Sequence, residues 1–416
     1  MSFVDTLESL IHRQEETISL VKTIELGENL IAEPICEDID NDGTKELILA
    51  SEQGTIYVIS SDYKLKAKFK IEENLDETES LFIDTNTGYS ITHTPLVEDI
   101  DGDGKKEIIF GTEFGTVYCI DSTGVLKWTF KAESAIRGGI SFFDADSDST
   151  KEIVFGSTDK NLYILGTNGK KKKIIKLNSE IESTPELING NIIVCLNNGE
   201  IIGISTKGEL QWNLKTDGKV TSKPKLMITE EKEYIIITST DNRVYCINQN
   251  GELEWKYETE GSIYGDAIIE DIDLDGYPEI IIGSCDNKLH IISDQGSKKW
   301  DFTTDFWIVG SPILMDINTD NKKEIVIGSY DTNIYVLSGR GEYVFDYVPG
   351  ISGIITQEGG YSEIPSDDPG QIQGKKLWTY KTKGLITGIC SNNNQLIAQT
   401  KDGRVLWLAN KISHQQ

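Results

Sequence analysis

The sequence is poor in cysteine and histidine, and neither residue type forms a recognisable reactive cluster. Six cysteines are spread over 416 residues without a C-x-x-C pair, mostly inside apolar runs. This distribution is typical of small buried core residues rather than of a disulfide framework. The four histidines are too scattered to indicate a metal cluster, and no Ser/His/Asp or Cys/His arrangement follows from the spacing. The sequence therefore identifies no catalytic centre.

Basic residues and long apolar runs are also scarce. Lys and Arg number 40 against 68 Asp and Glu, which gives a formal net charge of −28. This charge argues against a nucleic-acid partner, because such proteins carry a basic stripe that displaces counterions. No run approaches the ~18 continuous apolar residues that a membrane span needs.

The first twenty residues do not resemble a secretory signal. Charged side chains such as Asp5, Glu8 and Arg13 interrupt any apolar segment there, whereas a signal peptide needs an uninterrupted apolar core. We therefore expect a cytoplasmic protein, with an extracellular location by an unrecognised route as the alternative.

What the sequence does contain is an acidic nonapeptide that occurs five times between short apolar runs. The first copy reads Asp38-Ile-Asp40-Asn-Asp42-Gly-Thr-Lys-Glu46. The other copies place oxygen-bearing side chains at the same positions 1, 3, 5 and 9, namely Asp99, Asp101, Asp103 and Glu107; Asp144, Asp146, Asp148 and Glu152; Asp271, Asp273, Asp275 and Glu279; and Asp316, Asn318, Asp320 and Glu324. We call these segments the acidic loops.

The spacing of the acidic loops indicates an internal repeat. Asp99 and Asp144 are 45 residues apart, as are Asp271 and Asp316. The 127 residues from Asp144 to Asp271 correspond to three steps of about 42 residues, so two units without an acidic loop lie between them. A shorter unit ends the chain. The sequence therefore predicts eight units, with acidic loops in units 1, 2, 3, 6 and 7.

Each unit contains short runs rich in Val, Ile, Tyr and Phe that are bounded by Gly, Asp and Asn. Such runs are typical of strands, and pairs such as Asn168-Gly169 and Lys207-Gly208 supply the positive-φ residues of tight hairpins. Four antiparallel strands per unit, repeated eight times, predict an all-β, eight-bladed β-propeller. We expect a single domain over residues 18–416. Insertions at 72–90 and 341–374 could carry a recognition surface or serve as decoration.

The ends of the chain are predicted to close the ring. The eighth unit stops after its third strand, near Leu408, and residues 19–26 resemble the missing fourth strand. Because exposed strand edges promote aggregation, we predict that this N-terminal strand pairs with residues 403–411. Residues 1–17 are predicted to contain a short amphipathic helix that docks on the propeller, with a partner site as the alternative.

The acidic loops offer the hard oxygen ligands that Ca²⁺ requires. Side chains at positions 1, 3, 5 and 9 and the backbone carbonyl at position 7 suit its six to eight ligands, and Gly at position 6 permits the sharp turn. Without a cation, the carboxylates of each loop would repel one another. We expect up to five structural calcium ions, and the alternative is Asx turns bonded to the backbone. The position-7 residues are Thr44, Lys105, Thr150, Tyr277 and Lys322.

Two families are suggested by these motifs. The Asp-x-Asp-x-Asp-Gly loops ahead of an apolar strand resemble the FG-GAP and VCBS calcium repeats of integrin-type propellers. Unit ends such as Gly124-Val-Leu-Lys-Trp128 and Gly208-Glu-Leu-Gln-Trp212 are similar to the tryptophan-docking repeats of quinoprotein-like (PQQ-like) eight-bladed propellers. The second resemblance implies that the tryptophans pack between blades. The adjacent-cysteine pair of quinone-dependent alcohol dehydrogenases is absent, which argues against enzymatic use of pyrroloquinoline quinone.

A ligand site is expected around the ring axis, on the face opposite the acidic loops. The connections from the last strand of one unit to the first strand of the next converge there, and their mixture of polar and aromatic side chains suits a pocket. A water-lined channel is the alternative. The candidate residues are Thr92, His93, Arg137, Glu182, Thr221, Lys223, Tyr264 and Trp307, with Ala32, Glu33, Ser183 and Thr387 beside them.

These features favour a calcium-binding scaffold for protein–protein interaction over an enzyme, because the recognisable chemistry is structural. The alternatives are a propeller enzyme, either a quinone-dependent dehydrogenase or a polysaccharide lyase, and a carbohydrate or cell-surface adhesion module. A small ligand in the central funnel is compatible with each of them.

Overall fold

The computed structural model describes residues 18–72, 90–230, 232–344, 371–392 and 394–410. The predicted helix within residues 1–17, most of the insertion at 72–90 and the middle of the insertion at 341–374 lie outside the described residues. Within the described part, every regular element is a β-strand. No helix in the described residues has the length and apolar character of a membrane span.

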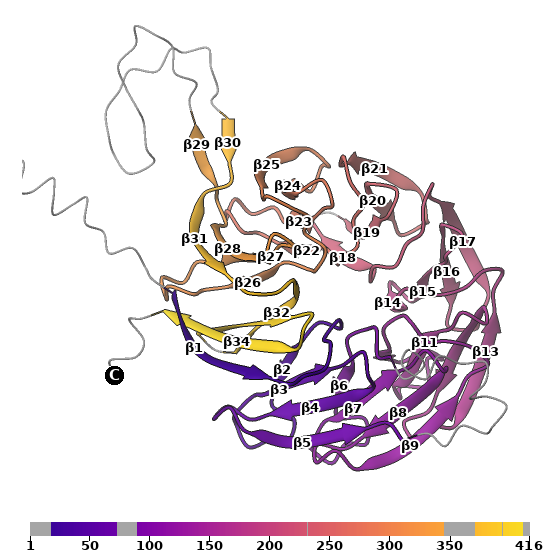
Figure 1. Ribbon diagram of the computed structural model, residues 1–416. Coiled ribbons are helices and arrows are strands. Elements are labelled where there is room, and N and C mark those ends of the chain that lie inside the picture. The colour runs from indigo at the N-terminus through magenta and orange to yellow at the C-terminus, as the bar shows by residue number, and fades with distance from the viewer. Residues whose placement is uncertain (1–17, 73–89, 231, 345–370, 393, 411–416) are drawn as a thin grey trace, which may run out of the picture.

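Eight four-stranded antiparallel sheets form the blades of a ring, which confirms the predicted propeller (Figure 1). We name the strands of each blade A to D in order from the ring axis outward. Blades 1 to 4 comprise β2 (Ile35–Glu37), β3 (Glu46–Ala50), β4 (Thr55–Ile59) and β5 (Leu65–Lys70); β6 (Leu96–Glu98), β7 (Glu107–Gly111), β8 (Thr116–Ile120) and β9 (Leu126–Lys131); β10 (Ser141–Phe143), β11 (Glu152–Gly156), β12 (Asn161–Leu165) and β13 (Lys171–Lys176); and β14 (Glu186–Ile188), β15 (Asn191–Cys195), β16 (Glu200–Ser205) and β17 (Leu210–Lys215).

The remaining blades follow the same order around the ring. Blades 5 to 8 comprise β18 (Lys225–Ile228), β19 (Glu233–Ser239), β20 (Arg243–Asn248) and β21 (Leu253–Glu258); β22 (Ile268–Glu270), β23 (Glu279–Gly283), β24 (Lys288–Ile292) and β25 (Lys298–Thr303); β26 (Ile313–Met315), β27 (Glu324–Gly328), β28 (Asn333–Ser338) and β31 (Lys376–Lys381); and β32 (Ile386–Asn392), β33 (Gln395–Thr400), β34 (Arg404–Asn410) and β1 (Ile18–Glu25).

The N-terminal strand closes the ring as predicted. Strand β1 pairs antiparallel with β34, from Ile18 opposite Asn410 to Glu25 opposite Arg404. Figure 1 shows these two strands side by side in blade 8, which packs on blade 1 at the seam of the ring. The outer strand of blade 8 therefore comes from the opposite end of the sequence, and its pairing covers the edge of β34.

The core consists of eight hydrophobic clusters, one at each interface between neighbouring blades. Middle strands such as β3 and β4 are buried along their whole length, because each of their faces packs on another blade. Outer strands such as β9 alternate between exposed and half-buried positions. These patterns are typical of strands buried on two faces and on one face, respectively.

Tryptophans of the outer strands pack against the next blade. Trp128 Nε1 donates to the carbonyl of Thr167 at 3.0 Å, and Trp255 Nε1 donates to the carbonyl of Asp294 at 3.0 Å. A Cβ added to Gly251 would lie 2.4 Å from the Trp212 ring. Glycine at this turn therefore lets the indole approach the backbone of the following blade.

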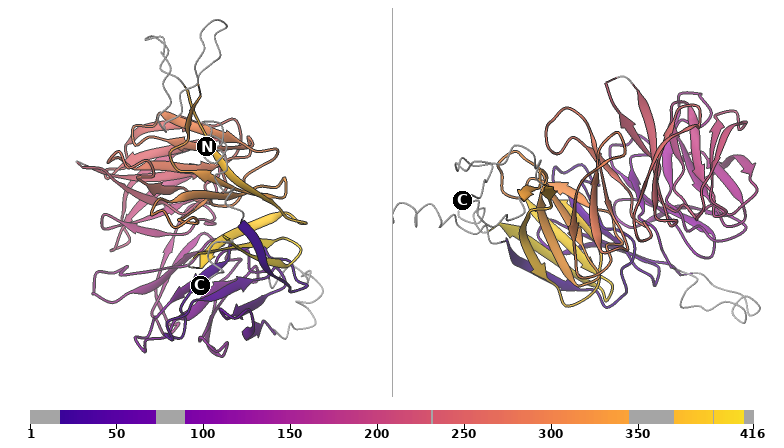
Figure 2. Two further views of the ribbon diagram at one scale, coloured as in Figure 1. Left: turned by 90° about the vertical axis from the view of Figure 1, so that its left-hand side faces the viewer. Right: turned by 90° about the horizontal axis from the view of Figure 1, so that it is seen from above.

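The insertion within blade 7 begins and ends as a two-stranded extension of β29 (Glu342–Val344) and β30 (Gln371–Gln373). It separates the third strand of that blade from the fourth and projects from the rim of the ring (Figures 1 and 2). The amide of Gly374 donates to the carbonyl of Asp301 at 3.0 Å, which attaches the base of the extension to blade 6.

Candidate functional site

The strand order places the two groups of candidate residues on opposite faces of the ring. Within an antiparallel blade, the A–B and C–D connections lie at one end of the strands, and the B–C and D–A connections lie at the other end. The acidic loops are the A–B connections of blades 1, 2, 3, 6 and 7, and we number them by blade. The predicted ligand residues lie on or beside the D–A connections.

All five acidic loops share two hydrogen bonds from backbone amides to side chains. The carboxylate at position 1 accepts a bond from the amide at position 6, as in Asp38–Gly43 at 2.9 Å and Asp316–Asn321 at 2.8 Å. The side chain at position 5 accepts from the amide at position 7 in every loop, at 2.8–2.9 Å. This is the Asx-type bonding that the sequence left open as the alternative to calcium.

Two acidic loops make the turn without glycine at position 6. Ser149 and Asn321 occupy that position with φ values of 70° and 63°, close to the left-handed conformation of Gly43 and Gly104 in loops 1 and 2. Asparagine tolerates this conformation better than most residues. Loops 3 and 7 therefore keep the shape of the others although their sequences depart from the motif.

The glutamate at position 9 is the buried anchor of each loop. It begins strand B and is 0–4 % exposed in all five blades. One carboxylate oxygen accepts a bond from the amide at position 2, at distances of 2.9–3.2 Å. Burial raises the pKa of Glu107 and of Glu279, although hydrogen bonds from lysines oppose the shift. The glutamate thus ties the start of its loop to the start of strand B.

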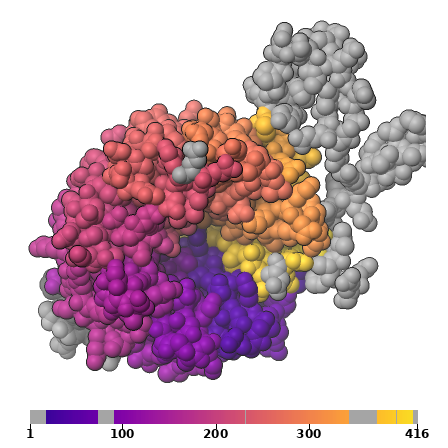
Figure 3. All heavy atoms as spheres, turned by 180° about the vertical axis from the view of Figure 1, so that it is seen from behind, coloured from indigo at the N-terminus to yellow at the C-terminus, as the bar shows by residue number. Residues whose placement is uncertain are grey.

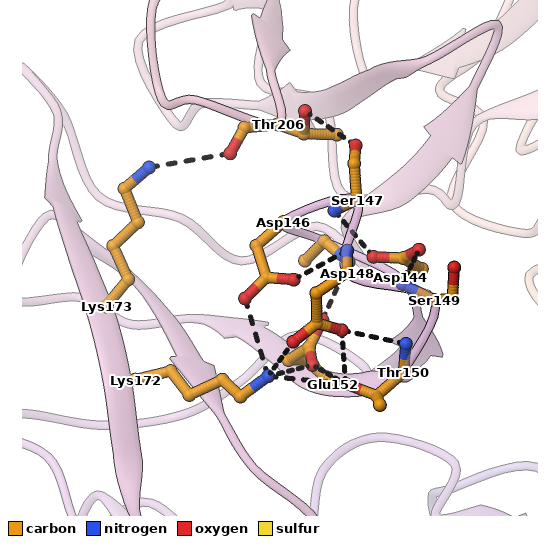
Figure 4. Close-up of polar contacts among 11 residues, drawn as sticks. Asp144, Asp146, Ser147, Asp148, Ser149, Thr150, Glu152, Lys172, Lys173 and Thr206 are labelled. Carbon is orange, nitrogen blue, oxygen red and sulfur yellow. Dashed lines mark hydrogen bonds and ion pairs between the residues drawn. The ribbon is translucent and has the colours of Figure 1, made fainter.

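A lysine from strand D reaches the acidic loop in four blades. In blade 3, Lys172 Nζ lies 3.4 Å from Asp146, 3.2 Å from Asp148 and 2.5 Å from Glu152 (Figure 4). The same contacts connect Lys66 with Asp40, Asp42 and Glu46, Lys127 with Asp101 and Glu107, and Lys299 with Asp273, Asp275 and Glu279. The carboxylate cluster of these loops is therefore partly neutralised by the chain itself.

This lysine occurs only in some blades at the second residue of strand D. Blade 7 has Leu377 there, and its acidic loop carries Asn318 rather than aspartate at position 3. Blades 4 and 5, which have no acidic loop, carry Gln211 and Glu254. Within this chain, the lysine therefore accompanies aspartate at position 3.

The carboxylates of these four loops also fit a divalent cation. In loops 1, 2, 3 and 6, three carboxylates each present an oxygen within 4.8 Å of the others. The oxygen-only donor set is the one that Ca²⁺ prefers. Burial lowers the pKa of Lys127, but hydrogen bonds to Asp101 and Glu107 outweigh it and raise the pKa above its usual value. A bound cation would have to displace this charged ammonium group.

The opposite face contains a central cavity of about 350 Å³. Seven of the eight connections between blades contribute to its wall, and Ile386 and Thr387 at the start of β32 contribute in place of the eighth. The lining includes the predicted residues Ala32, Glu33, Thr92, His93, Arg137, Glu182, Thr221, Tyr264 and Thr387. A space-filling view of the other face shows that the ring is also hollowed at its centre there (Figure 3). The D–A connections therefore converge on one polar chamber.

Charged side chains on one side of the cavity are paired across neighbouring blades. Arg137 Nε lies 2.8 Å from a carboxylate oxygen of Glu113, and Arg137 Nη1 lies 3.3 Å from Glu182. Lys219 also contacts Glu182. Burial raises the pKa of Glu182, but Lys219, Asn197 and Arg137 lower it below the usual value. These pairs connect the B–C loop of blade 2 with the D–A connections that follow blades 2, 3 and 4.

A series of backbone-to-side-chain bonds continues around the axis. Ser311 N donates to Glu33 Oε1 at 2.8 Å, Asp266 N donates to Ser311 Oγ at 3.0 Å, and Lys223 N donates to Asp266 Oδ1 at 2.8 Å. Burial and the neighbouring Asp266 raise the pKa of Glu33, although the bond from Ser311 opposes this shift. The inner ends of blades 1, 5, 6 and 7 are thus linked through their own polar groups.

Three predicted pocket residues, Ser183, Lys223 and Trp307, lie outside the lining of this cavity. Ser183 is buried, and its Oγ donates to the carbonyl of Cys195 at 2.9 Å. Lys223 directs its ammonium group to Glu186 at 2.8 Å. Trp307 is 44 % exposed and stacks at a tilt on Phe306, with ring centroids 5.0 Å apart. The sequence reasoning also missed lining residues, namely Asp266, Ser311, Tyr330 and Lys401. Tyr330 and Lys401 come from B–C connections, which share this face and could have been included by topology.

Comparison with known families identifies the propeller. The family model described as the lambda-carrageenase beta-propeller domain matches residues 87–185, 191–264 and 234–347, which together exceed half of the chain. The chain belongs to the lambda-carrageenase propeller family. The matched residues include acidic loops 2, 3, 6 and 7 and most of the cavity wall. The FG-GAP, VCBS and quinoprotein resemblances stay sequence-based predictions.

Curated relatives of this carrageenase-type propeller match over a short segment. The lambda-carrageenases of Pseudoalteromonas carrageenovora and of a Pseudoalteromonas species are each 35 % identical to it over 88 residues. That segment is 21 % of this chain and 8 % of each relative. The chain therefore corresponds to a small part of those proteins.

Solved structures show the same fold at low sequence identity. BamB from Moraxella catarrhalis has a TM-score of 0.62 and 16 % identity. The match covers 96 % of this chain and 100 % of the BamB chain. The computationally designed Ika8 protein has a TM-score of 0.65 and 14 % identity, and covers 94 % of this chain and 100 % of its own. BBS1N in complex with ARL6DN has a TM-score of 0.51 and 12 % identity. The match covers 76 % of this chain and 91 % of the BBS1N chain.

Proposed function

We propose that this carrageenase-type propeller is a non-catalytic binding module that serves as a scaffold for a protein partner, with the central cavity as the recognition site. The observation that carries the proposal is the composition of the cavity wall, which is formed by seven of the eight connections between blades and by the start of β32. Loops held on a rigid ring can present many different side chains to one partner. The ring thus supplies a fixed frame and the loops supply specificity.

The bonding of the charged groups supports binding rather than turnover. Arg137 forms ion pairs with Glu113 and Glu182, and Glu33 accepts a hydrogen bond from the amide of Ser311. Groups held in this way brace neighbouring loops and present a preformed surface. A partner can then bind with little ordering cost.

The proposal is tested with the intact chain immobilised and the captured partner identified by mass spectrometry. The Tyr264→Ala and Arg137→Ala variants, which alter the cavity, should lose at least tenfold in affinity for that partner. The Tyr277→Ala variant is the matched control, because Tyr264 and Tyr277 are each 50 % exposed but Tyr277 lies in an acidic loop on the other face. Equal binding by all three variants would place the partner site elsewhere.

A second candidate, recognition of a galactan chain, is favoured by the family match and by exposed aromatic side chains on two D–A connections. Tyr264 lines the cavity, and Phe306 and Trp307 are each 44 % exposed. Aromatic rings can cover the apolar faces of sugars while neighbouring polar groups bind the hydroxyls. The wall carries three carboxylates and two permanent cations, so a weakly charged oligosaccharide fits it better than a densely sulfated one.

Calorimetry with galactan oligosaccharides of graded sulfation distinguishes this candidate from the first. If it holds, affinity decreases as sulfation increases, and Tyr264→Ala weakens binding while Tyr277→Ala does not. Incubation of the same oligosaccharides with the chain should release no new reducing ends. Shortened products that disappear in the His93→Ala variant would overturn the non-catalytic proposal.

We also propose that the acidic loops bind up to five structural calcium ions. The support is the set of carboxylate oxygens within 4.8 Å of one another in loops 1, 2, 3 and 6. Binding would replace the lysine contact by metal–oxygen bonds and would connect strands A and B of each blade. The melting temperature should rise with millimolar Ca²⁺ and fall to its starting value with EDTA. A melting temperature that is independent of Ca²⁺, with no metal in dialysed protein, would refute this proposal.

A further inference from the structure

Two cysteines meet at the seam where the ring closes. Cys36 belongs to the innermost strand of blade 1 and Cys390 to the innermost strand of blade 8. They are 354 residues apart in the sequence, yet their Sγ atoms are 3.1 Å apart. Both side chains are buried, at 8 % and 9 % exposure. The separation is only about 1 Å longer than a disulfide bond.

The other four cysteines do not share this arrangement. Cys119 lies in blade 2, Cys195 in blade 4, Cys246 in blade 5 and Cys285 after strand B of blade 6. Among the described residues, none of these four sulfurs makes a sulfur–sulfur contact like that between Cys36 and Cys390. Closure of the ring brings Cys36 and Cys390 together, because their strands come from the first and last blades.

The seam around the pair is held by side chains and by the N-terminal strand. Cys36 and Cys390 belong to one hydrophobic cluster with Leu47, Tyr57 and Trp407. Polar bonds cross the same interface, including Gln399 Nε2 to the carbonyl of Ala32 at 2.6 Å and Thr387 Oγ1 to the carbonyl of Leu30 at 2.8 Å. The contacts that join the two ends of the ring are thus non-covalent while the thiols are reduced.

We propose that Cys36 and Cys390 are an oxidation site whose disulfide covalently locks the propeller at its seam. The oxidant is a low-molecular-weight disulfide such as oxidised glutathione. One cysteine thiolate attacks it, forms a mixed disulfide and releases one glutathione thiolate, which takes up a proton. The second cysteine thiolate then attacks the protein-bound sulfur and releases the second glutathione. Two protein thiols are oxidised and one glutathione disulfide is reduced to two thiols.

Burial determines when this exchange occurs. It raises the pKa of Cys390 well above the usual value, and the neighbouring Cys36 raises it further. Thiolate is therefore scarce in the closed ring, and exchange requires the seam to open or takes place before it closes during folding. The pair is expected to be a dithiol in a reducing compartment and a disulfide in an oxidising one.

The experiment uses the full chain after incubation with oxidised glutathione in mild denaturant and return to buffer. The bridged protein should be lighter by two hydrogen atoms, and a proteolytic map should show residues 36 and 390 linked. Its melting temperature should rise by about 5 °C, and dithiothreitol should reverse the rise. Cys119→Ser, which removes a buried thiol in blade 2, should behave like the unchanged chain.

Variants of the two cysteines test whether this pair causes the mass loss and the rise in melting temperature. Cys36→Ala and Cys390→Ala should fold but show neither the mass loss nor the rise in melting temperature. Six free thiols after oxidation would overturn the proposal, as would stable glutathione adducts without a bridge. Links that involve any of the other four cysteines would also overturn it. If Cys36→Ala does not fold, the mass and the proteolytic map of the unchanged chain decide alone.

Discussion

Blades 3 and 7 carry the same acidic loop but balance its charge differently. In blade 3, Lys172 of strand D contacts Asp146, Asp148 and Glu152. In blade 7, Leu377 stands at the corresponding position. In both loops the amides at positions 6 and 7 donate to the side chains at positions 1 and 5, so these bonds of the turn do not depend on the lysine.

The difference indicates what the lysine does. Its position is filled by Lys in the four blades whose loops have aspartate at position 3, and by Gln211, Glu254 or Leu377 in blades 4, 5 and 7. A lysine that served only to solubilise the outer strand would not follow the loop in this way. We interpret it as a built-in counter-ion for the buried glutamate and the position-3 aspartate. Loop 7 has less charge to neutralise and dispenses with it.

The largest effect is expected when a lysine is removed from a loop that has one. Lys127→Met leaves Glu107, whose side chain is 1 % exposed, without its cationic partner. The expected loss is about 2 kcal/mol in the free energy of unfolding without calcium, because breaking a partly buried pair strands the remaining charge. Chemical denaturation measures this loss.

The matched control for that substitution is Gln211→Met. Gln211 occupies the same position of strand D in blade 4, which has no acidic loop, so this change should alter stability by less than about 0.5 kcal/mol. If both variants lose the same stability, the lysine acts through the outer strand alone, and the comparison between blades fails. Adding millimolar Ca²⁺ to Lys127→Met sharpens the comparison, since a cation in loop 2 should restore part of the loss.

The blades and the acidic loops were predictable because both repeat locally in the sequence. The residues of each acidic loop, such as Asp38 to Glu46, are contiguous in the sequence. Hydrophobic runs separated by turn residues flank each loop. Closure by residues 18–25 was predictable for a related reason, since the last unit lacked one strand and the first residues supplied it. Such features can be read from residues that are close in the sequence or from the number of strands in each unit.

The lysine contacts were not predicted because they depend on the register of the strands. The cysteine pair was not predicted because it depends on closure of the ring. Lys127 follows Glu107 by 20 residues, and only the pairing of strands B, C and D shows that its ammonium group reaches the loop. Cys36 and Cys390 are joined by the ring as a whole. An alignment of the eight units would have revealed the lysine, whereas the cysteines occur once each and leave no repeat signal.

A smaller effect is expected from acidification. Hydrogen bonds from Thr150 and Lys172 lower the pKa of Asp148 from 3.8 to about 2, and the pKa values of Asp42 and Asp275 are also lowered. Carboxylates with lowered pKa contribute stability above pH 4 that is lost as the pH falls towards 2. Stability should therefore decrease over this interval in thermal melts.

Two buried glutamates oppose that trend at higher pH. The raised pKa values of Glu107 and Glu279 mean that the folded protein takes up their protons first, so stability rises slightly as the pH falls towards 4.5. Together the shifts predict a shallow maximum between about pH 4 and 4.5. The Asp148→Asn variant should show a smaller decrease between pH 4 and 2. A decrease of unchanged size would show that loop 3 does not contribute to acid unfolding.

The smallest effect is expected from transferring the blade 3 arrangement to blade 7. Leu377→Lys alone places an ammonium group beside Glu324, Asp320 and the neutral Asn318, and should change stability by less than about 0.5 kcal/mol. Combined with Asn318→Asp, it should gain about 0.5–1 kcal/mol more than the two single changes together, because each new charge then faces its partner. Asn318→Asp alone should destabilise the loop, since it adds a fourth carboxylate without a cation.

Additive effects in this double-mutant cycle would show that lysine and position-3 aspartate are independent. A positive coupling would identify them as one unit that blade 7 lacks.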